Sequence, residues 1–156
     1  MQAYIIQVIM AVLGSVGFAI LFQTKGYKLF YIAFGGAVSW IVYLFFYIRN
    51  GDPVISTLLS TIVVAAIAEL SARIIKTPVI ILLVPMLIPL IPGSNLYYTM
   101  HNLLFGQTAE SMHYLQLALE EAGAIAGGII LLAFVTQFIT KTKNYISNIR
   151  KNEENS

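Results

Sequence analysis

Long stretches without a charged side chain dominate this sequence. Residues 1–24, 29–48 and 122–140 contain no Asp, Glu, Lys or Arg. A helix needs about 20 apolar residues to cross the ~30 Å hydrocarbon core of a bilayer, so each stretch predicts a transmembrane helix. The strict alternation that is typical of strands in membrane barrels is absent. The sequence therefore predicts an all-α, polytopic integral membrane protein.

Composition excludes several classes of function. Of the 156 residues, 58% are hydrophobic and 10% are charged, whereas a soluble domain carries about 25% charged residues. A water-soluble enzyme is therefore not expected, and a net charge of +2 gives no reason to expect a nucleic-acid partner. Because the chain has no cysteine, thiolate metal sites are ruled out. His101, Glu110 and His113 match no zinc spacing, so no metal and no cofactor are predicted.

A single transmembrane domain, residues 1–142, is expected to hold about five spans. They cover residues 4–22, 29–48, 53–75, 79–92 and 120–140. The fourth segment is the exception, because 14 residues at ~1.5 Å each reach only about two thirds of the way across. It must be tilted, re-entrant, or broken and continued to residue 105. Residues 143–156 predict a flexible cytoplasmic tail.

The positions of the basic residues predict the orientation of the chain. Four of them flank the connections after the first and third spans: Lys25, Lys28, Arg73 and Lys76. With five crossings and the N-terminus outside, these four lie in the cytoplasm together with the basic C-terminal residues. A re-entrant fourth segment would move all four outside if the C-terminus stayed inside. Five spans, N-terminus outside and C-terminus inside, are therefore predicted.

Local signals predict where two of these helices begin. Asp52-Pro53 and Thr77-Pro78 each place a capping residue before a proline, the usual order at a helix N-terminus. Glycine and alanine recur at spacings of three or four in several spans, for example Gly35-Gly36, and predict close helix packing. Glu120 and Glu121 begin the last span, where the helix dipole favours acidic residues, and this position alone accounts for them.

Glu69 and Arg73 are the first candidates for function. They are spaced i,i+4 with the acid first, which favours an ion pair on one face of the third span. Ionisable residues inside a membrane persist where they are buried in protein or line a wet cavity. Glu69 is therefore expected either to face a transport pathway, as a proton acceptor or a counter-charge for substrate, or to hold two helices in register. The sequence leaves these two interpretations open.

The second candidate is a proline-rich segment in the fourth span. Pro85, Pro89 and Pro92 remove three backbone N–H groups within eight residues, so the carbonyls of Ile81, Pro85 and Ile88 lose their helical partners. Broken backbone at membrane depth is tolerated where it packs in protein or lines a cavity. The three residues that follow are Gly93, Ser94 and Asn95. They predict a hinge and a new helix N-terminus suited to a carboxylate. A kinked structural helix is the alternative.

These segments resemble one known family. Two blocks carry the resemblance: Ala68-Glu69-x2-Ala72-Arg73-x2-Lys76-x-Pro78 and Val84-Pro85-x2-Ile88-Pro89-Leu90-x-Pro92-Gly93, the second followed by Tyr97. With Gly36-x3-Trp40-x2-Tyr43 before them, they are similar to the C-terminal, five-helix half of the threonine/serine exporter family. The resemblance covers the chain from the second span to the last. The length is similar to the split, two-component form of the family.

The resemblance implies a function and partners. The chain would be the small subunit of a secondary transporter in a bacterial inner membrane, with a larger partner subunit that carries the other half. Its substrate would be a small polar metabolite, either threonine and serine or a dicarboxylate such as succinate, exported by the proton-motive force. Association of several copies of the chain stays open. The alternative is a membrane assembly protein that does not transport; an enzyme is not expected.

Overall fold

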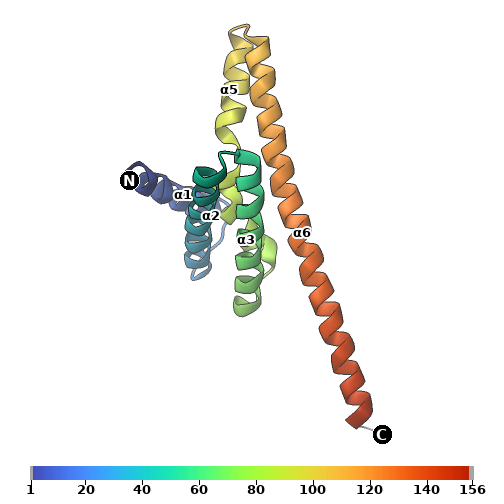
Figure 1. The fold of residues 1–156 in the computed structure, drawn as a ribbon. Helices are drawn as coiled ribbons and strands as arrows, with labels where there is room; N and C mark the ends of the chain where they lie inside the picture. The colour runs from blue at the N-terminus through green and yellow to red at the C-terminus, as the bar shows by residue number, and fades with distance from the viewer. Residues whose placement is uncertain (1, 155–156) are drawn as a thin grey trace.

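The computed structural model describes residues 2–154, with side chains as far as Phe138 and at Lys141. Every regular element in this part of the chain is helical (Figure 1). The elements are α1 (Gln2–Leu21), α2 (Lys28–Asn50), α3 (Pro53–Ile75), α4 (Val79–Leu87), the 3-10 turn η1 (Ile88–Leu90), α5 (Gly93–Leu104) and α6 (Thr108–Glu154). The all-α class is confirmed.

Four helices are long and apolar enough to cross a membrane: α1, α2, α3 and the Thr108–Phe138 part of α6. A fifth candidate is the pair Val79–Leu90 and Gly93–Leu104, which meet at an angle of 54°. This composition and length confirm a polytopic membrane protein with four or five spans. The predicted broken fourth span corresponds to the bent pair.

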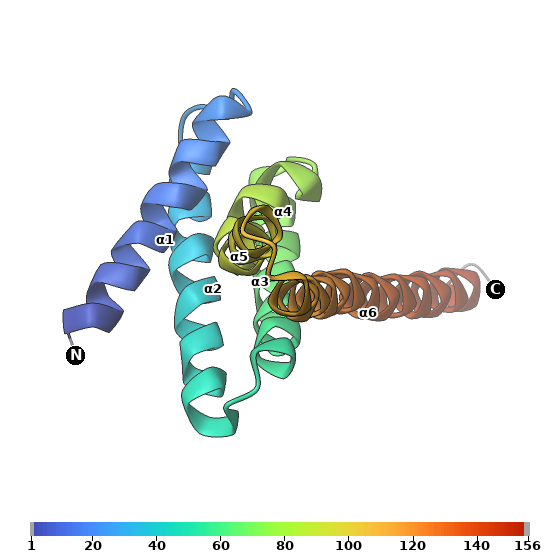
Figure 2. The same cartoon turned by 90° about the horizontal axis from the view of Figure 1, so that it is seen from above.

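Each long helix packs on the next in the order α1, α2, α3, α6, so α1 and α6 lie on opposite sides of the bundle. α1 packs on α2, α2 on α3, and α3 on α6, while α4 lies against both α2 and α3. Viewed from above, α1 lies in the plane of the picture on one side and α6 lies on the other (Figure 2). α5 packs along the first turns of α6, and this hairpin extends beyond the start of α3 (Figure 1).

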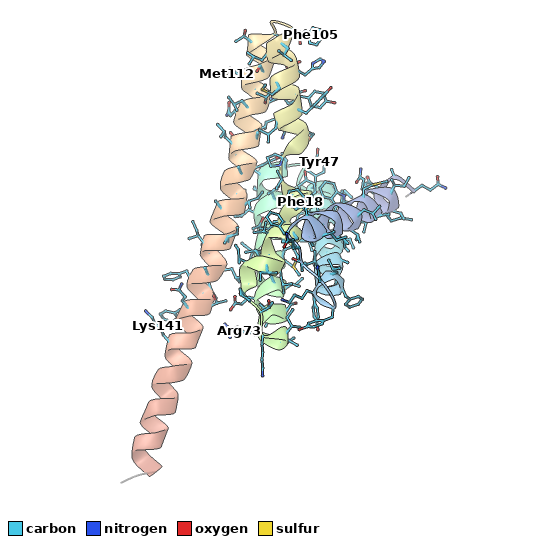
Figure 3. All side chains as sticks on the ribbon, turned by 180° about the vertical axis from the view of Figure 1, so that it is seen from behind. Phe18, Tyr47, Arg73, Phe105, Met112 and Lys141 are labelled. Carbon is cyan, nitrogen blue, oxygen red and sulfur yellow. The ribbon has the colours of Figure 1, made fainter. Side chains whose placement is uncertain are left out.

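The bent pair runs from the level of Arg73 to the end of the molecule at which Phe105 lies (Figure 3). Arg73, near the end of α3, and Lys141 of α6 line the same groove and lie at one level, whereas Phe105, after α5, lies at the far end (Figure 3). The chain therefore leaves the Arg73 level through α4, reaches the opposite end through α5, and returns through α6. By length and composition the bent pair is a broken span or a re-entrant loop, and the crossing stays a prediction.

One of the two predicted caps is present and the other is not. Asp52 Oδ1 accepts hydrogen bonds from the backbone N–H groups of Val54 (2.8 Å) and Ile55 (3.2 Å), which confirms the first. The prediction for Thr77 was wrong, because the residue before α4 is Pro78 and no side chain caps this helix. The Thr77 hydroxyl is instead buried without a hydrogen-bond partner.

Small residues form the contacts between α1, α2, α3 and α6. A Cβ placed on Gly36 would collide with the side chain of Ser15, and one placed on Gly128 would approach the Thr61 side chain to 2.8 Å. Ser60 of α3 donates a hydrogen bond to the Ser39 carbonyl of α2 (2.6 Å). In a bilayer the lipid tails are as apolar as the helix surfaces, so the hydrophobic effect does not drive helices together. Van der Waals contact at close approach and interhelical hydrogen bonds hold them instead.

The segment predicted as a tail, residues 143–156, is helical as far as Glu154 because α6 continues to that residue. Its last two residues lie outside the described part of the chain. Its flexibility and its cytoplasmic location stay predictions.

Candidate functional site

Three prolines interrupt the helix between α4 and α5, and each lies in a different element or connection. Pro85 lies inside α4, Pro89 lies in η1, and Pro92 precedes α5. Ile91, between the last two, is extended (φ −63°, ψ 130°) and interrupts the helix. The interruption separates two helical axes that differ by 54°.

Two of the three carbonyls that the prolines would leave without hydrogen-bond donors accept bonds at the 3-10 turn η1. The Ile88 N–H donates to the Pro85 carbonyl, and the Ile91 N–H donates to the Ile88 carbonyl at 3.2 Å. These are i,i+3 bonds in place of the i,i+4 bonds that proline forbids. The backbone at the break therefore offers fewer free acceptors than the sequence suggested.

Two cavities border the broken span on the side of α1 and α2. One of about 300 Å³ lies between α1, α2 and η1, and Ile88 and Pro89 form part of its wall. The other, of about 470 Å³, lies where the connection from α1 to α2 meets α4, and its wall includes Lys25, Lys28 and Pro85. Pro85 and Pro89 thus line open space, as a pathway through the broken span would require.

The start of α5 joins the break to α6. Pro92 is buried, Gly93 and Ser94 are exposed, and Asn95 is half-buried. No side chain caps α5. The Gly93 N–H donates to the Ile91 carbonyl (2.7 Å), so the N–H groups of Ser94 and Asn95 are the ones that face an anion here. The Asn95 amide Nδ2 donates a hydrogen bond to Glu121 Oε2 of α6 at 3.2 Å.

Glu121 is a residue that the sequence pattern assigned only to a helix terminus. Its side chain is 7% exposed, and among the residues of described burial it is the one charged residue in the buried class. The sequence contained a signal for this burial, because Glu121 lies on the same face of α6 as several other buried residues. These are Ser111, Ala118, Ala124 and Gly128. Their spacings of three, four and seven describe one stripe, on which Glu120 does not fall.

An aromatic row on α2 approaches Glu121 from the other side. Trp40 stacks on Tyr43 with ring centroids 5.0 Å apart, and Tyr43 stacks on Tyr47 at 5.6 Å. Tyr43 is half-buried and close enough to Glu121 to interact with it electrostatically. Glu121 is therefore bonded to the first turn of α5, and Tyr43 of α2 is near enough to sense its charge.

Glu69 and Arg73 form the predicted ion pair on α3. Arg73 donates to Glu69 Oε1 through Nη2 (2.8 Å) and Nε (3.0 Å). The Arg73 side chain is 57% exposed and that of Glu69 is 25% exposed. Both line a shallow groove of about 390 Å³ against α6, together with Thr136, Gln137 and Lys141.

The structure keeps the two predicted groups of site residues apart. The six residues of the break and its hinge lie together: Pro85, Pro89, Pro92, Gly93, Ser94 and Asn95. Glu69 and Arg73 lie in a different groove, on α3 against α6. Within the described residues no group of three His, Asp or Glu side chains could hold a metal ion. The acid that does contact the break is Glu121.

Comparison with known families decides the identity of the chain. The family model described as Threonine/Serine exporter, ThrE, matches residues 7–135. The chain belongs to the threonine/serine exporter family. Neither a curated protein nor a solved structure matches it significantly.

Membership in the threonine/serine exporter family confirms the resemblance found in the sequence and makes the chain a membrane transport protein. The match covers all of α1 after its first turn, the bent pair and the apolar part of α6. Every candidate residue of this exporter, Glu121 included, lies inside the matched range.

Proposed function

We propose that this chain is one subunit of a secondary transporter that exports threonine and serine across a bacterial inner membrane. The observation that carries the proposal is the family match over residues 7–135. The exporter would be driven by the proton-motive force and would need a larger partner subunit that supplies the other half of the path. A dicarboxylate such as succinate is the alternative substrate.

The broken span is the proposed contact with substrate. It is supported by the two cavities that Pro85 and Pro89 line, and by the uncapped start of α5 at Gly93, Ser94 and Asn95. The positive end of a helix dipole attracts a carboxylate, a group that threonine, serine and succinate all carry. Discontinuous helices serve this purpose in other transporter folds.

Glu69 is the proposed acid at the other end of the path. At rest it is paired with Arg73 beside the groove that Lys141 also lines. A proton that reached Glu69 would remove its charge and release Arg73. The pair would in this way respond to the proton gradient.

The test is efflux of preloaded substrate from cells that lack their own exporters. The chain is expressed alone, with its partner subunit, and with the partner subunit replaced by an unrelated membrane protein as control. We expect efflux of threonine and serine only when both subunits are present. Efflux of succinate in place of the amino acids would change the substrate, and full efflux from the single chain would contradict the need for a partner.

A membrane assembly protein without transport is the second candidate, because Gly36 and Gly128 lie close to side chains of neighbouring helices and Ser60 bonds to α2, contacts that serve helix packing alone. It predicts no efflux of any of the three substrates although both chains are stable in the membrane. It also predicts that the partner subunit loses stability when this chain is deleted.

A further inference from the structure

A buried acid next to a hinge has a defined set of neighbours. From α5, Asn95 donates one hydrogen bond to Glu121. From α2, Tyr43 interacts with it, and Tyr47 stacks on Tyr43. On α6 itself, Glu120 is exposed and accepts a hydrogen bond from Gln116 at 2.8 Å, so it is engaged elsewhere.

The other element that packs along α6, besides α5, is α3, which runs in the same direction (Figure 1). Gly128 lies against Thr61 and Leu58, and two turns earlier on both helices Glu121 is level with the first turn of α3. The charged residue there is Asp52, which is occupied in capping α3. The cation at this end of α2, Arg49, is exposed and forms no ion pair with Glu121 among the described residues, whereas Glu69 is paired with Arg73.

Ionisation of Glu121 in this arrangement would leave a buried charge with one neutral hydrogen-bond donor. Such a charge is strongly unfavourable unless it is paired or hydrated, so the closed arrangement favours the neutral carboxyl group. Hydration of the carboxylate requires α5 to move away from α6. The connection through Pro92 and Gly93, where the helix is already interrupted, allows that movement.

We propose that Glu121 is a proton-binding group whose protonation is coupled to opening of the α4–α5 break. The proposal rests on the proposed exporter function and adds a second acid to it, about four turns of α6 before the Thr136–Lys141 segment that faces Glu69. The arrangement with α5 packed on α6 binds the proton, and its loss favours an arrangement in which Glu121 meets water. By linkage, opening must therefore increase as the pH rises.

A proton is a better ligand for Glu121 than the ammonium group of an amino acid. Glu121 is buried, and it lines neither of the two cavities at the break nor the groove beside Glu69. A proton needs no space of its own. An ammonium group would need a cavity that the carboxylate faces.

The test uses the absence of cysteine from the natural sequence. A single cysteine replaces Ala118, which is 3% exposed and one turn before Glu121 on the same face of α6. Its rate of labelling by a membrane-impermeant maleimide is measured in intact cells that also carry the partner subunit, from about pH 5 to about pH 9. A single cysteine at Met112, 63% exposed, corrects for the pH dependence of the thiol itself.

We expect the corrected rate at Ala118→Cys to rise with pH, by up to about tenfold per pH unit for one linked proton. With Glu121→Gln, which keeps the size and the hydrogen bond, the rate should be independent of pH. Glu120→Gln is the matched control and should leave the rise unchanged. Slower labelling at Ala118→Cys than at Met112→Cys at low pH shows in each variant that the hairpin has folded.

Three results would overturn the inference. The first is a rate that does not depend on pH in the Ala118→Cys protein, and the second is the same rise in Glu121→Gln. The third is a rate that responds to added threonine but not to pH, which would assign Glu121 to the substrate ammonium group. Labelling does not depend on export, so absent efflux with a normal pH response would contradict the proposed function and leave the coupling intact.

Discussion

Glu69 and Glu121 show that two residues of one type can be given different properties by their neighbours. Glu69 has a cation one turn away and a groove beside it. Glu121 is buried and has an amide and a tyrosine for neighbours. The i,i+4 partner of Glu69 is visible in the sequence because both residues lie on one helix. The neighbours of Glu121 lie on α5 and α2, so no spacing in the sequence predicts them.

Glu69→Gln should stop proton-driven export without preventing assembly. The partly exposed ion pair contributes at most about 1 kcal/mol to stability, so loss of the charge leaves the fold intact while it removes the proposed proton site. The measurement is the rate of threonine efflux in each variant, divided by the amount of assembled complex in the membrane. The exchanged variant, Glu69→Arg with Arg73→Glu, keeps a pair but moves the acid, and should also fail. Full export by the exchanged variant would show that the pair only holds the helix in place.

Gly36→Ala should destabilise the protein by about 1–3 kcal/mol, the usual range for overpacking. The added methyl group would collide with Ser15 of α1, and both residues belong to helices that pack face to face. Gly17→Ala is the matched control, because nothing lies within 4 Å of a Cβ at that position. Reversible unfolding in mixed detergent micelles compares the two. Equal stabilities would mean that α1 is not held against α2 in this way.

The bent pair shows how far prolines alone predict an element. Their spacing predicted a break in the fourth span, and the structure has one, bent by 54°. The spacing also predicted free carbonyls, but the turn η1 satisfies two of them through i,i+3 bonds. Whether the carbonyls near a proline stay free or form i,i+3 hydrogen bonds depends on the helices that pack around the segment. Here α1, α2 and α4 all contact η1.

The double substitution Pro89→Ala with Pro92→Ala should straighten the pair. Spin labels at Ile80→Cys and Leu104→Cys, both exposed positions, would be ~36 Å apart on a straight helix, and the observed 54° bend shortens this by roughly 4 Å. We expect the distance to increase towards the straight value in the double variant. Pro85→Ala, within α4, is the control and should not change it. An unchanged distance in the double variant would assign the bend to packing.

The whole molecule presents its two outermost helices differently. α1 buries only small residues against the bundle, namely Ala11, Ser15 and Ala19, whereas α6 is held by both α3 and α5. Arg73 and Lys141 share a level, and Phe105 is at the other end (Figure 3). This order fits five crossings, which place the basic residues of both elements on one side of the membrane.

Labelling of single cysteines in intact cells should establish the orientation. Asn50→Cys, after α2, should react with a membrane-impermeant maleimide, and Lys25→Cys, after α1, should react only once the membrane is permeabilised. Five spans with the N-terminus outside put these two connections on opposite sides, with the lysines inside. Both positions are exposed, so burial does not prevent the reaction. The reverse pattern would contradict the predicted orientation.

The sequence by itself determined the fold class, because about 20 uncharged apolar residues have few stable arrangements other than a helix in lipid. It also determined the first cap at Asp52, the Glu69–Arg73 pair and the place of the break, since each depends on residues within about two turns of one another. Only the tertiary structure decided that the break and Glu69 lie apart, and that Glu121 is buried beside Asn95. Contacts between helices distant in the chain depend on how whole helix faces pack, and this physical information is not local.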